Sequence, residues 1–377
     1  MKVPYVDLKV QYENLRPELE AAHQEVIEQG QFIGGVAVNR FEQDFANYHK
    51  TKHCIGVGSG SDALFLALKM LGIGEGDEVI TTAFSYVATA NAILRTGAHP
   101  VFVDVDKHTF NINLSQILSK ISNRTKAIVP VHLYGLMVDM YMIKAIAEQH
   151  DLLVVEDAAQ AHGALWNGHS PGFLSDAACF SFYPTKQLGA FGDGGAIVTN
   201  NGELASRCRL LANNHSVLSG DQKVPGINSR LDPIQAGYLN VKLGHLNKWQ
   251  VRRQELANRY KVELIDLPIE FQNQAAEATH AWYNFPVLVE RRDEFVDFMN
   301  SEGVAVVKNY DYILPRVEDG LTQFPIADYL SKQVVSLPIF SEMTDSQIVW
   351  VKRCVKSYFG KKKLKNITKQ ELNPEKL

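Results

Sequence analysis

Short, unbroken apolar runs alternate with longer amphipathic stretches over the first two thirds of the chain. Seven runs predict strands, at residues 54–57, 78–82, 100–105, 127–131, 152–156, 177–182 and 196–199. These runs lack the polar–apolar alternation of a half-exposed strand, so both faces of their sheet are expected to be buried. Stretches with helical spacing separate them, at 62–71, 86–96, 140–149 and 203–213. The pattern predicts an α/β fold in which helices cover both faces of a mostly parallel sheet.

The two ends of the chain have a different pattern. Helices are predicted at 17–30, where apolar residues recur at helical spacing up to Gly30, and at 40–48. After about residue 246, a long charged helix (249–265) leads into an α+β pattern. The predicted elements there are 283–290, 291–302 and 333–337. We therefore expect a large domain over residues 1–245 and a smaller α+β domain over 246–377. The basic segment 361–365 is expected to be a solvated, frayed terminus.

Composition narrows the class of protein. The 377 residues are 46% apolar and 21% charged, and the formal net charge of −4 gives no basic excess for nucleic acid. Four widely separated cysteines have no metal-ligand spacing, and we expect reduced thiols and no metal site. The N-terminal sequence lacks the apolar core of a signal peptide, and no run is long enough for a bilayer. These features predict a cytoplasmic protein with no membrane partner.

A glycine- and serine-rich loop, residues 56–62, joins the first predicted strand to the helix that follows it. Glycines allow a ligand to approach the backbone, and the helix N-terminus favours an anion such as phosphate. The alternative is a tight turn with Ser61 as the N-cap residue. A nicotinamide-binding fingerprint would need a third glycine where Ser61 stands, and it would need an acidic residue at the end of a strand at the expected distance, which this chain lacks. The loop therefore gives little support to an oxidoreductase.

The predicted strand 152–156 ends on two carboxylates, Glu156 and Asp157, followed by small residues. Ligands of open α/β sheets bind beyond the carboxyl ends of strands, and the small residues leave room for a flat ring. Asp157 could hold a protonated ring nitrogen, and Gln160 could form a hydrogen bond with an oxygen on the same ring. The alternative is that Asp157 only caps a turn. His162 is expected to be structural.

One lysine, Lys186, follows the predicted strand 177–182 and precedes a run of glycines. Burial would favour its neutral amine, which is the form that Schiff-base chemistry needs. The alternative is a side chain that extends its ammonium to water. A phosphate cradle, a carboxylate for a ring nitrogen and a lysine are together the requirements of pyridoxal 5'-phosphate (PLP). The combination predicts a PLP enzyme.

Longer motifs carry a resemblance to a known family. They include "GSDAL" from Gly60, "TTAFSYVATANAI" from Thr81, "EDAAQAHGA" from Glu156, "SFYPTK" from Ser181, "GDGGAIVTN" from Gly192 and "GINSRLDPIQAGYL" from Gly226. With these motifs the chain resembles the DegT/StrS family of sugar-nucleotide aminotransferases, which are fold-type I PLP enzymes. The resemblance extends from Val3 to Pro338.

The resemblance implies a role for each matching residue. Lys186 would bond covalently with PLP and carry protons, and Asp157 would pair with the pyridine nitrogen; these are the expected catalytic residues. The other expected cofactor contacts are Gln160 at the ring hydroxyl, Tyr86 stacked on the ring, Gly60, Ser61 and Ser181 at the phosphate, and Asn228 at the phosphate of a neighbouring subunit. The family therefore implies a homodimer with shared active sites.

The resemblance also implies a reaction. An amino group would pass from L-glutamate to a nucleotide-linked keto-6-deoxyhexose, with dTDP-3-keto-6-deoxyhexose favoured, in a pathway to surface polysaccharide or another deoxysugar product. A UDP-linked keto sugar aminated at C3 or C4 is the alternative, and a PLP-binding regulator without turnover is a hypothesis of another class. Lysine at position 186 favours transamination over the dehydratase activity of relatives that have histidine there.

The substrate side departs from the family pattern. Many members have a His-Tyr-Pro-x-Pro segment where this chain has Asp311 in place of the histidine and Ile313 in place of the first proline. Tyr183, His215 and Asp311 are the substrate-side candidates. For His215, which ends an Asn-Asn-His segment, a simple polar turn is the alternative.

Overall fold

A seven-stranded sheet forms the centre of the computed structural model, which describes residues 1–219, 222–315 and 323–371. Its strands lie in the order β1-β8-β7-β5-β4-β2-β3. Their bounds are β1 His53–Val57, β2 Glu78–Thr82, β3 His99–Val103, β4 Thr125–Val129, β5 Leu153–Asp157, β7 Ala177–Ser181 and β8 Gly195–Thr199. Each of the seven predicted strands overlaps one of these. The predicted α/β class with a mostly parallel sheet is confirmed, because only β8 runs antiparallel to its neighbours.

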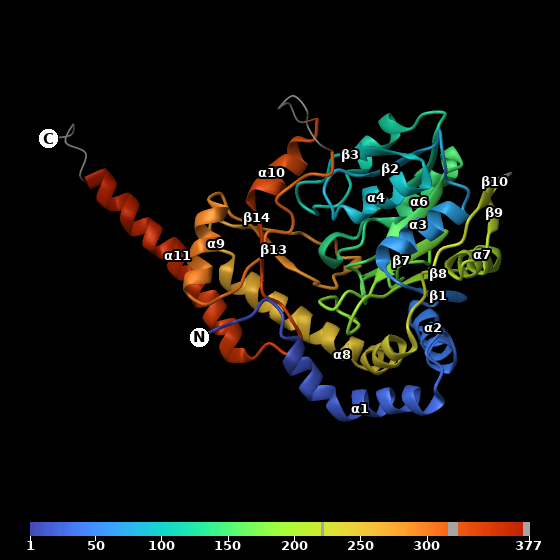
Figure 1. The fold of residues 1–377 in the computed structure, drawn as a ribbon. Coiled ribbons are helices and arrows are strands. Elements are labelled where there is room, and N and C mark those ends of the chain that lie inside the picture. The colour runs from blue at the N-terminus through green and yellow to red at the C-terminus, as the bar shows by residue number, and fades with distance from the viewer. Residues whose placement is uncertain (220–221, 316–322, 372–377) are drawn as a thin grey trace.

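Helices cover both faces of this sheet, as the unbroken apolar runs predicted (Figure 1). On one face, alternate strand residues pack against α3 (Gly60–Met70), α4 (Ala88–Thr96) and α7 (Gly202–Ala212). On the other, the remaining strand residues pack against α2 (Val36–His49), α6 (Met140–His150) and α8 (Pro233–Leu264). Because every strand except the edge strand β3 contributes residues to both cores, these strands show no polar face in their sequence.

Two helices begin well before the predicted residues. α1 spans Leu8–Gln29 and contains Pro17, which the sequence analysis took as its start. The actual start is set by Asp7, whose carboxylate accepts the N–H of Val10 at 3.1 Å. α8 begins at Pro233, sixteen residues before the predicted 249, and Pro at the first helical position suits a helix start. α8 is therefore continuous across residue 245, where the domain boundary was predicted.

The C-terminal part has its own small sheet and core. The sheet order is β11-β13-β14, with bounds Glu270–Phe271, Phe285–Leu288 and Val334–Leu337. Its helices are α9 (Arg292–Ser301), α10 (Pro325–Gln333) and α11 (Asp345–Glu371), and the core includes residues from the far half of α8. The remaining short elements are α5 Leu114–Ile117, η1 Leu118–Lys120, η2 Leu133–Gly135, β6 Leu165–Trp166, β9 Val217–Ser219, β10 Gln222–Val224 and β12 Ala278–Thr279.

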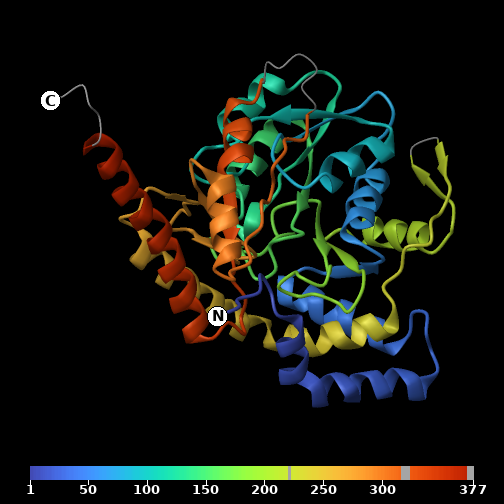
Figure 2. The ribbon, with the colours of Figure 1, turned by 60° about the vertical axis from the view of Figure 1, so that its left-hand side comes forward.

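The basic segment 361–365 is helical, so the prediction of a frayed terminus was wrong. It belongs to α11, whose far end extends away from the rest of the molecule in both views (Figures 1 and 2). The physical reason is that residues 361–371 contain neither glycine nor proline, so nothing in the sequence ends the helix.

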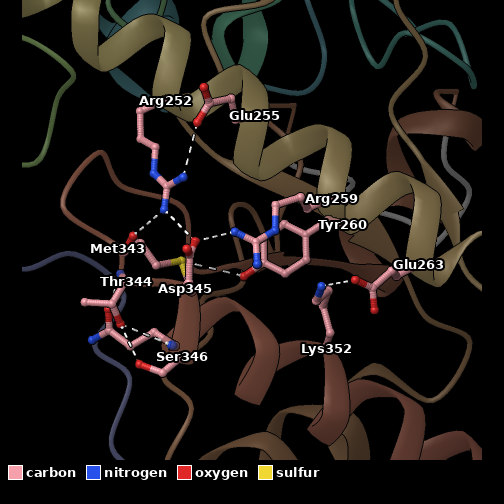
Figure 3. Close-up of polar contacts among 11 residues, drawn as sticks. Arg252, Glu255, Arg259, Tyr260, Glu263, Met343, Thr344, Asp345, Ser346 and Lys352 are labelled. Carbon is pink, nitrogen blue, oxygen red and sulfur yellow. Dashed lines mark hydrogen bonds and ion pairs between the residues drawn. The ribbon is translucent and has the colours of Figure 1, made fainter.

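The start of α11 is attached to α8 by ion pairs (Figure 3). Arg252 and Arg259 of α8 both contact the carboxylate of Asp345, and Arg252 does so at 3.1 Å. The two guanidinium groups lower the pKa of that carboxyl group below its ordinary value. About two helical turns after Asp345, Lys352 of α11 pairs with Glu263 of α8. The pairs with the exposed carboxylate of Asp345 stabilise little, whereas Lys352 is buried; apolar packing between α8 and α11 accompanies both contacts.

Candidate active site

Three chain segments meet closely at the edge of the sheet where β5 and β7 end. A side chain at Gly60 would put its Cβ 2.7 Å from the Cβ of Ser181, the last residue of β7. A Cβ at Gly195, the first residue of β8, would lie 2.4 Å from the carbonyl carbon of Ser59. Real Cβ atoms do not approach so closely, so glycine is required at both places. The start of α3 is thereby pressed against the end of β7.

The N-terminus of α3 fits the predicted anion cradle. Its N-cap residue is Ser59, whose hydroxyl accepts the N–H of Asp62 at 3.1 Å. The alternative interpretation, in which Ser61 is the N-cap, was therefore wrong. The N–H groups of Gly60 and Ser61 belong to the first turn, where no intrahelical acceptor exists. Gly60, the first residue of the helix, lies directly against Ser181, so this corner suits a phosphate group.

Asp157, the last residue of β5, is a buried carboxylate. One oxygen accepts the hydroxyl of Thr89 at 2.7 Å, and the other accepts the N–H of Ala159 at 3.2 Å. Burial raises the pKa of this carboxyl group; the hydrogen bonds from Thr89 and Ala159 and the nearby charge of Lys186 oppose the rise. The Ala159 contact is the turn that the alternative interpretation predicted. Thr89 is a partner that the sequence analysis missed.

The side-chain amide of Gln160 is held in one orientation. Its Oε1 accepts the backbone N–H of Tyr134 at 2.6 Å, and its Nε2 donates to the hydroxyl of Tyr310 at 2.9 Å. A backbone N–H can only donate, so the oxygen must face Tyr134 and the nitrogen must face the other way. One N–H of Nε2 remains for a further acceptor. This arrangement suits an oxygen anion on a ring, as predicted.

Lys186 lies beside an aromatic ring and is half-buried, between the two alternatives of a buried amine and an ammonium that extends to water. Its Nζ is 4.2 Å from the centre of the ring of Tyr283, a distance typical of a cation–π contact. The hydroxyl of Tyr283 lies 3.2 Å from that of Thr185, the neighbour of Lys186. Lys186 follows β7 and Asp157 ends the neighbouring parallel strand β5, so both lie at the same edge of the sheet, where the charge of Lys186 opposes the rise in the pKa of Asp157. Tyr283 was not predicted from the sequence.

The loop that carries Lys186 is tightly folded, and a lysine of α8 forms a hydrogen bond with its backbone. A Cβ at Gly189 would lie 2.3 Å from the carbonyl oxygen of Pro184, so only glycine fits there. The carbonyl oxygen of Gly189 accepts the ammonium of Lys242 at 2.6 Å. Burial lowers the pKa of Lys242 to about 8. The sequence signal for this residue is a lysine within an otherwise apolar helical stretch, which the sequence analysis passed over.

Two other polar residues of the same motif are structural. Glu156 accepts hydrogen bonds from the ring of His132 at 2.6 Å and from the N–H of Gly172 at 2.7 Å. His162 is fully buried, with its ring 5.3 Å from that of Phe180, and burial lowers its pKa to about 3. His162 is thus the structural histidine that was expected.

The remaining candidates face outward from this single chain. Tyr86 and Tyr183 are 53% and 54% exposed, and the ring of Tyr86 lies 6.0 Å from that of Tyr310. The other exposed candidates are His215, Asn228 and Asp311. The structure thus brings together Gly60, Ser181, Asp157 and Lys186, whereas the predicted substrate residues Tyr183, His215 and Asp311 are exposed. Within the described ranges, no helix is long and apolar enough to cross a bilayer.

Comparison with curated proteins gives relatives over nearly the whole chain. A "pleiotropic regulatory protein" of Geobacillus stearothermophilus is 42% identical over 95% of this chain and 99% of its own. A dTDP-3-amino-3,4,6-trideoxy-alpha-D-glucose transaminase of Streptomyces venezuelae is 41% identical, over 95% of this chain and 96% of its own. A UDP-N-acetyl-3-dehydro-alpha-D-glucosamine 3-aminotransferase of Acidithiobacillus ferrooxidans is 39% identical, over 92% and 95%.

Solved structures agree in fold. DesV of S. venezuelae superposes with a TM-score of 0.91 at 40% identity, covering 95% of this chain and 98% of its own. NtdA of Bacillus subtilis, solved with the bound cofactor PMP, gives a TM-score of 0.87 at 30% identity, covering 95% and 85%. The family model of the DegT/DnrJ/EryC1/StrS aminotransferases matches residues 13–356. The chain therefore belongs to the DegT/DnrJ/EryC1/StrS aminotransferase family.

Proposed function

We infer that this chain is a PLP-dependent sugar-nucleotide aminotransferase, and we propose that Lys186 and Asp157 are its catalytic residues. The observation that carries the assignment of residues is that Asp157 ends β5 and Lys186 follows the neighbouring parallel strand β7, beside the N-terminus of α3. The relative NtdA, which has a similar fold, was solved with PMP, the aminated form of this cofactor. The transaminase names of the S. venezuelae and A. ferrooxidans relatives support the reaction class.

The residues at this edge fit the cofactor by their chemistry. Gly60, Ser61 and Ser181 offer backbone and hydroxyl donors for its phosphate, and the dipole of α3 favours the negative charge. Asp157 is a buried carboxylate in need of a cationic partner, which a protonated ring nitrogen would supply. The free N–H of Gln160 Nε2 is a donor for the ring oxygen. Tyr86 is proposed as the aromatic residue that stacks on the ring.

When bound, the cofactor supplies a ring that withdraws electrons from the reacting carbon of the substrate. Asp157 keeps the ring nitrogen protonated and so strengthens that withdrawal. Lys186 would hold the cofactor before substrate binds. Once the amine of the substrate replaces it, the freed Nζ would take the proton from the substrate carbon and deliver it to the cofactor carbon on the other side of the shared nitrogen. Proton transfer by a positioned base of this kind contributes about 10²–10⁴-fold to rate.

The reaction has two halves that share the site. L-glutamate is the proposed donor, and a nucleotide-linked keto sugar is the proposed acceptor, which gives ping-pong kinetics. We favour a dTDP-linked 3-keto-6-deoxyhexose, because the S. venezuelae relative is named for a dTDP sugar aminated at C3. A UDP-linked keto sugar is the alternative, since the A. ferrooxidans relative is named for one. Tyr183, His215 and Asp311 are the proposed contacts with the sugar nucleotide.

We propose a homodimer in which each site receives a residue from the other chain. Asn228 is exposed and lies in the strand-like pair with Asn213 outside its own site, which suits contact with the phosphate of a second copy. The exposed ring of Tyr86 suits the same arrangement. A direct check is the variant Asn228→Ala, which is expected to bind PLP more weakly without losing the dimer in sedimentation.

The test of the function uses glutamate and a panel of keto-sugar nucleotides. The purified protein with PLP is expected to show a visible absorption band that glutamate bleaches, and dTDP-3-keto-6-deoxyhexose is expected to restore the band. A matched UDP-linked 3-keto sugar measures the alternative directly. A protein that binds no PLP, or whose band glutamate leaves unchanged, would contradict the proposal.

A regulator without turnover is the second candidate, because the G. stearothermophilus relative is named as a regulatory protein. This candidate requires that the site binds PLP but does not use it. The Lys186–Asp157 pair argues against it, since both groups that turnover needs are present. The glutamate experiment separates the two: complete bleaching of the band within a catalytic time excludes a merely binding role.

A further inference from the structure

Tyr310 lies next to the proposed site but has no part in the roles assigned so far. It precedes Asp311 in the segment where the chain departs from the family pattern. Its hydroxyl accepts the N–H of Gln160 Nε2 at 2.9 Å, across 150 residues of sequence. Its ring lies 6.0 Å from Tyr86 and 5.5 Å from Tyr312. Tyr310 thus touches both the proposed cofactor contacts and the proposed sugar side.

The segment that carries Tyr310 is fixed in place by a second tyrosine. The hydroxyl of Tyr134 donates to the carbonyl oxygen of Asn309, and the backbone N–H of Tyr134 donates to Gln160 Oε1 at 2.6 Å. Leu314 N–H further along the segment donates to the carbonyl oxygen of Ala83 at 2.9 Å. Tyr310 and Gln160 are therefore held from two directions, and their hydrogen bond is part of a closed set of contacts.

The tyrosines around this contact stay neutral over the range in which enzymes are assayed. Burial raises the pKa of Tyr310 well above its ordinary value, and the neighbouring hydroxyls of Tyr283 and Tyr134 raise it further. Burial also raises the pKa of Tyr134 and of Tyr312. A neutral hydroxyl of Tyr310 accepts the amide N–H and keeps its own O–H proton.

The amide of Gln160 has two N–H bonds, and Tyr310 occupies one of them. The bond to Tyr134 fixes the carbonyl end, and the bond to Tyr310 fixes the rotation of the nitrogen end. With both ends fixed, the second N–H points in one direction without further loss of side-chain entropy. We propose that Tyr310 is a positioning residue that aims this second N–H of Gln160 at the ring oxygen of the cofactor. It would thereby link the sugar-side segment to the cofactor.

This inference rests on the proposed roles of Lys186 and Gln160. An N–H aimed at the ring oxygen draws negative charge away from the covalent linkage between Lys186 and the cofactor. Without it the linkage holds its proton more tightly, so the pH midpoint at which the visible band changes is higher. Tyr310→Phe removes only the hydroxyl and is expected to raise this midpoint by about half a pH unit. A shift of this size corresponds to part of the free energy of one hydrogen bond.

The experiment titrates the visible band of the PLP-loaded protein in four variants. Gln160→Leu is expected to raise the midpoint more than Tyr310→Phe does. Tyr310→Phe in the Gln160→Leu background is expected to add nothing, because the hydroxyl acts through the amide. Tyr312→Phe is the matched control, a neighbouring tyrosine with no contact to Gln160 among those the structure gives, and is expected to leave the midpoint unchanged. Thermal melting of the PLP-free variants checks that each is folded.

Three results would overturn the inference. They are a Tyr310→Phe midpoint equal to that of the parent, a shift that persists in the Gln160→Leu background, and an equal shift in Tyr312→Phe. A failure of the proposed function itself has a different signature: the parent protein then has no visible band that depends on Lys186. A band that is present in the parent and lost in Lys186→Ala leaves the proposed function standing, whatever Tyr310→Phe does.

Discussion

The cofactor side and the substrate side of the proposed site differ in how much of each one chain provides. On the cofactor side, Asp157 and Gln160 are buried and Lys186 is half-buried, and each is held by named hydrogen bonds or ring contacts. On the substrate side, Tyr183 and Asp311 are exposed, and within the described part of the chain their side chains form no hydrogen bond.

This difference indicates what each side requires. Groups that act on a ring must be held within a fraction of an ångström, so the fold fixes them through buried contacts. Groups that meet a large, polar sugar nucleotide lie on loops, which tolerate change and accept contributions from a second chain. We therefore expect substitutions on the two sides to have effects of different kind as well as different size.

The largest expected effect is that of Lys186→Ala, which removes the proposed anchor and base together. Turnover is expected to fall by at least about 10²–10⁴-fold, since no other amine in the described ranges contacts Tyr283. The visible band should disappear in the same variant. Steady-state kinetics and an absorption spectrum measure both. Lys248→Ala, an exposed lysine of α8, is the matched control and should change neither.

Asp157→Asn is expected to lower turnover without lowering the stability of the PLP-free protein. Turnover should fall by about 10²-fold, because a neutral amide cannot keep the ring nitrogen protonated. The PLP-free protein should be no less stable at pH 7 than the parent. The reason is that the folded-state pKa of Asp157 is raised, so ionisation of this buried group costs stability as pH rises above its unfolded value.

Thermal melting of the PLP-free protein and steady-state kinetics test this prediction. Asp44→Asn, on the exposed side of α2, is the control for a lost surface charge. A clearly lower melting temperature for Asp157→Asn at pH 7 would contradict the argument that ionisation of Asp157 costs stability. Unchanged turnover would contradict the cofactor role of this residue.

On the substrate side, Asp311→Ala and His215→Ala are expected to act on one half-reaction only. Each should raise KM for the sugar nucleotide by about five- to tenfold, the size of one lost hydrogen bond. The rate at which glutamate bleaches the visible band should stay the same, because neither residue contacts the cofactor side. Stopped-flow absorbance of each half-reaction measures the two effects. Equal slowing of the glutamate half would erase the distinction between the two sides.

The smallest expected effect concerns the core under the cofactor side. His49 and His162 are fully buried, and burial lowers the pKa of each to about 3. Folded-state values below the unfolded value mean that both contribute stability above pH 6.5 and lose it progressively as pH falls towards 3. Melting temperature should therefore fall with acid, by a few degrees between pH 7 and 6. His49→Leu should flatten this dependence, whereas a parallel curve would contradict it.

The fold and the position of Asp157 and Lys186 at one sheet edge could be predicted because their signals are local in sequence. The strands are unbroken apolar runs, since all but the edge strand β3 are buried on two faces. Asp157, Lys186 and the glycines near them stand in short motifs whose members also meet in space. The strand edge where ligands bind then follows from the chain direction alone.

What could not be predicted depends on contacts between distant residues. Gln160 and Tyr310 are 150 residues apart, and Lys242 and Gly189 are 53 apart. Thr89 reaches Asp157 from a helix whose sequence shows no sign of that partner. The start of α8 was missed because polar residues, among them Lys242 and Arg253, interrupt the apolar pattern of its buried face, and because the two halves of the helix pack in different cores. A helix is easiest to predict from its sequence when one face packs against one core along its whole length, whereas α8 packs against two cores.

That helix limits how the two parts of the molecule can be exchanged between relatives. α8 has 32 residues and is about 48 Å long, and residue 245 lies inside it. Before this point Lys242 binds the loop of Lys186; beyond it Arg253 donates to the carbonyl oxygens of Trp282 and Ile339. Each residue turns the helix by about 100°, so one inserted residue at 245 would swing Arg253 away from both carbonyls. A chimera joined at residue 245 must therefore keep the number of residues in α8 unchanged. Insertions or deletions in this helix are expected to be excluded between relatives, because they would disrupt both parts of the molecule.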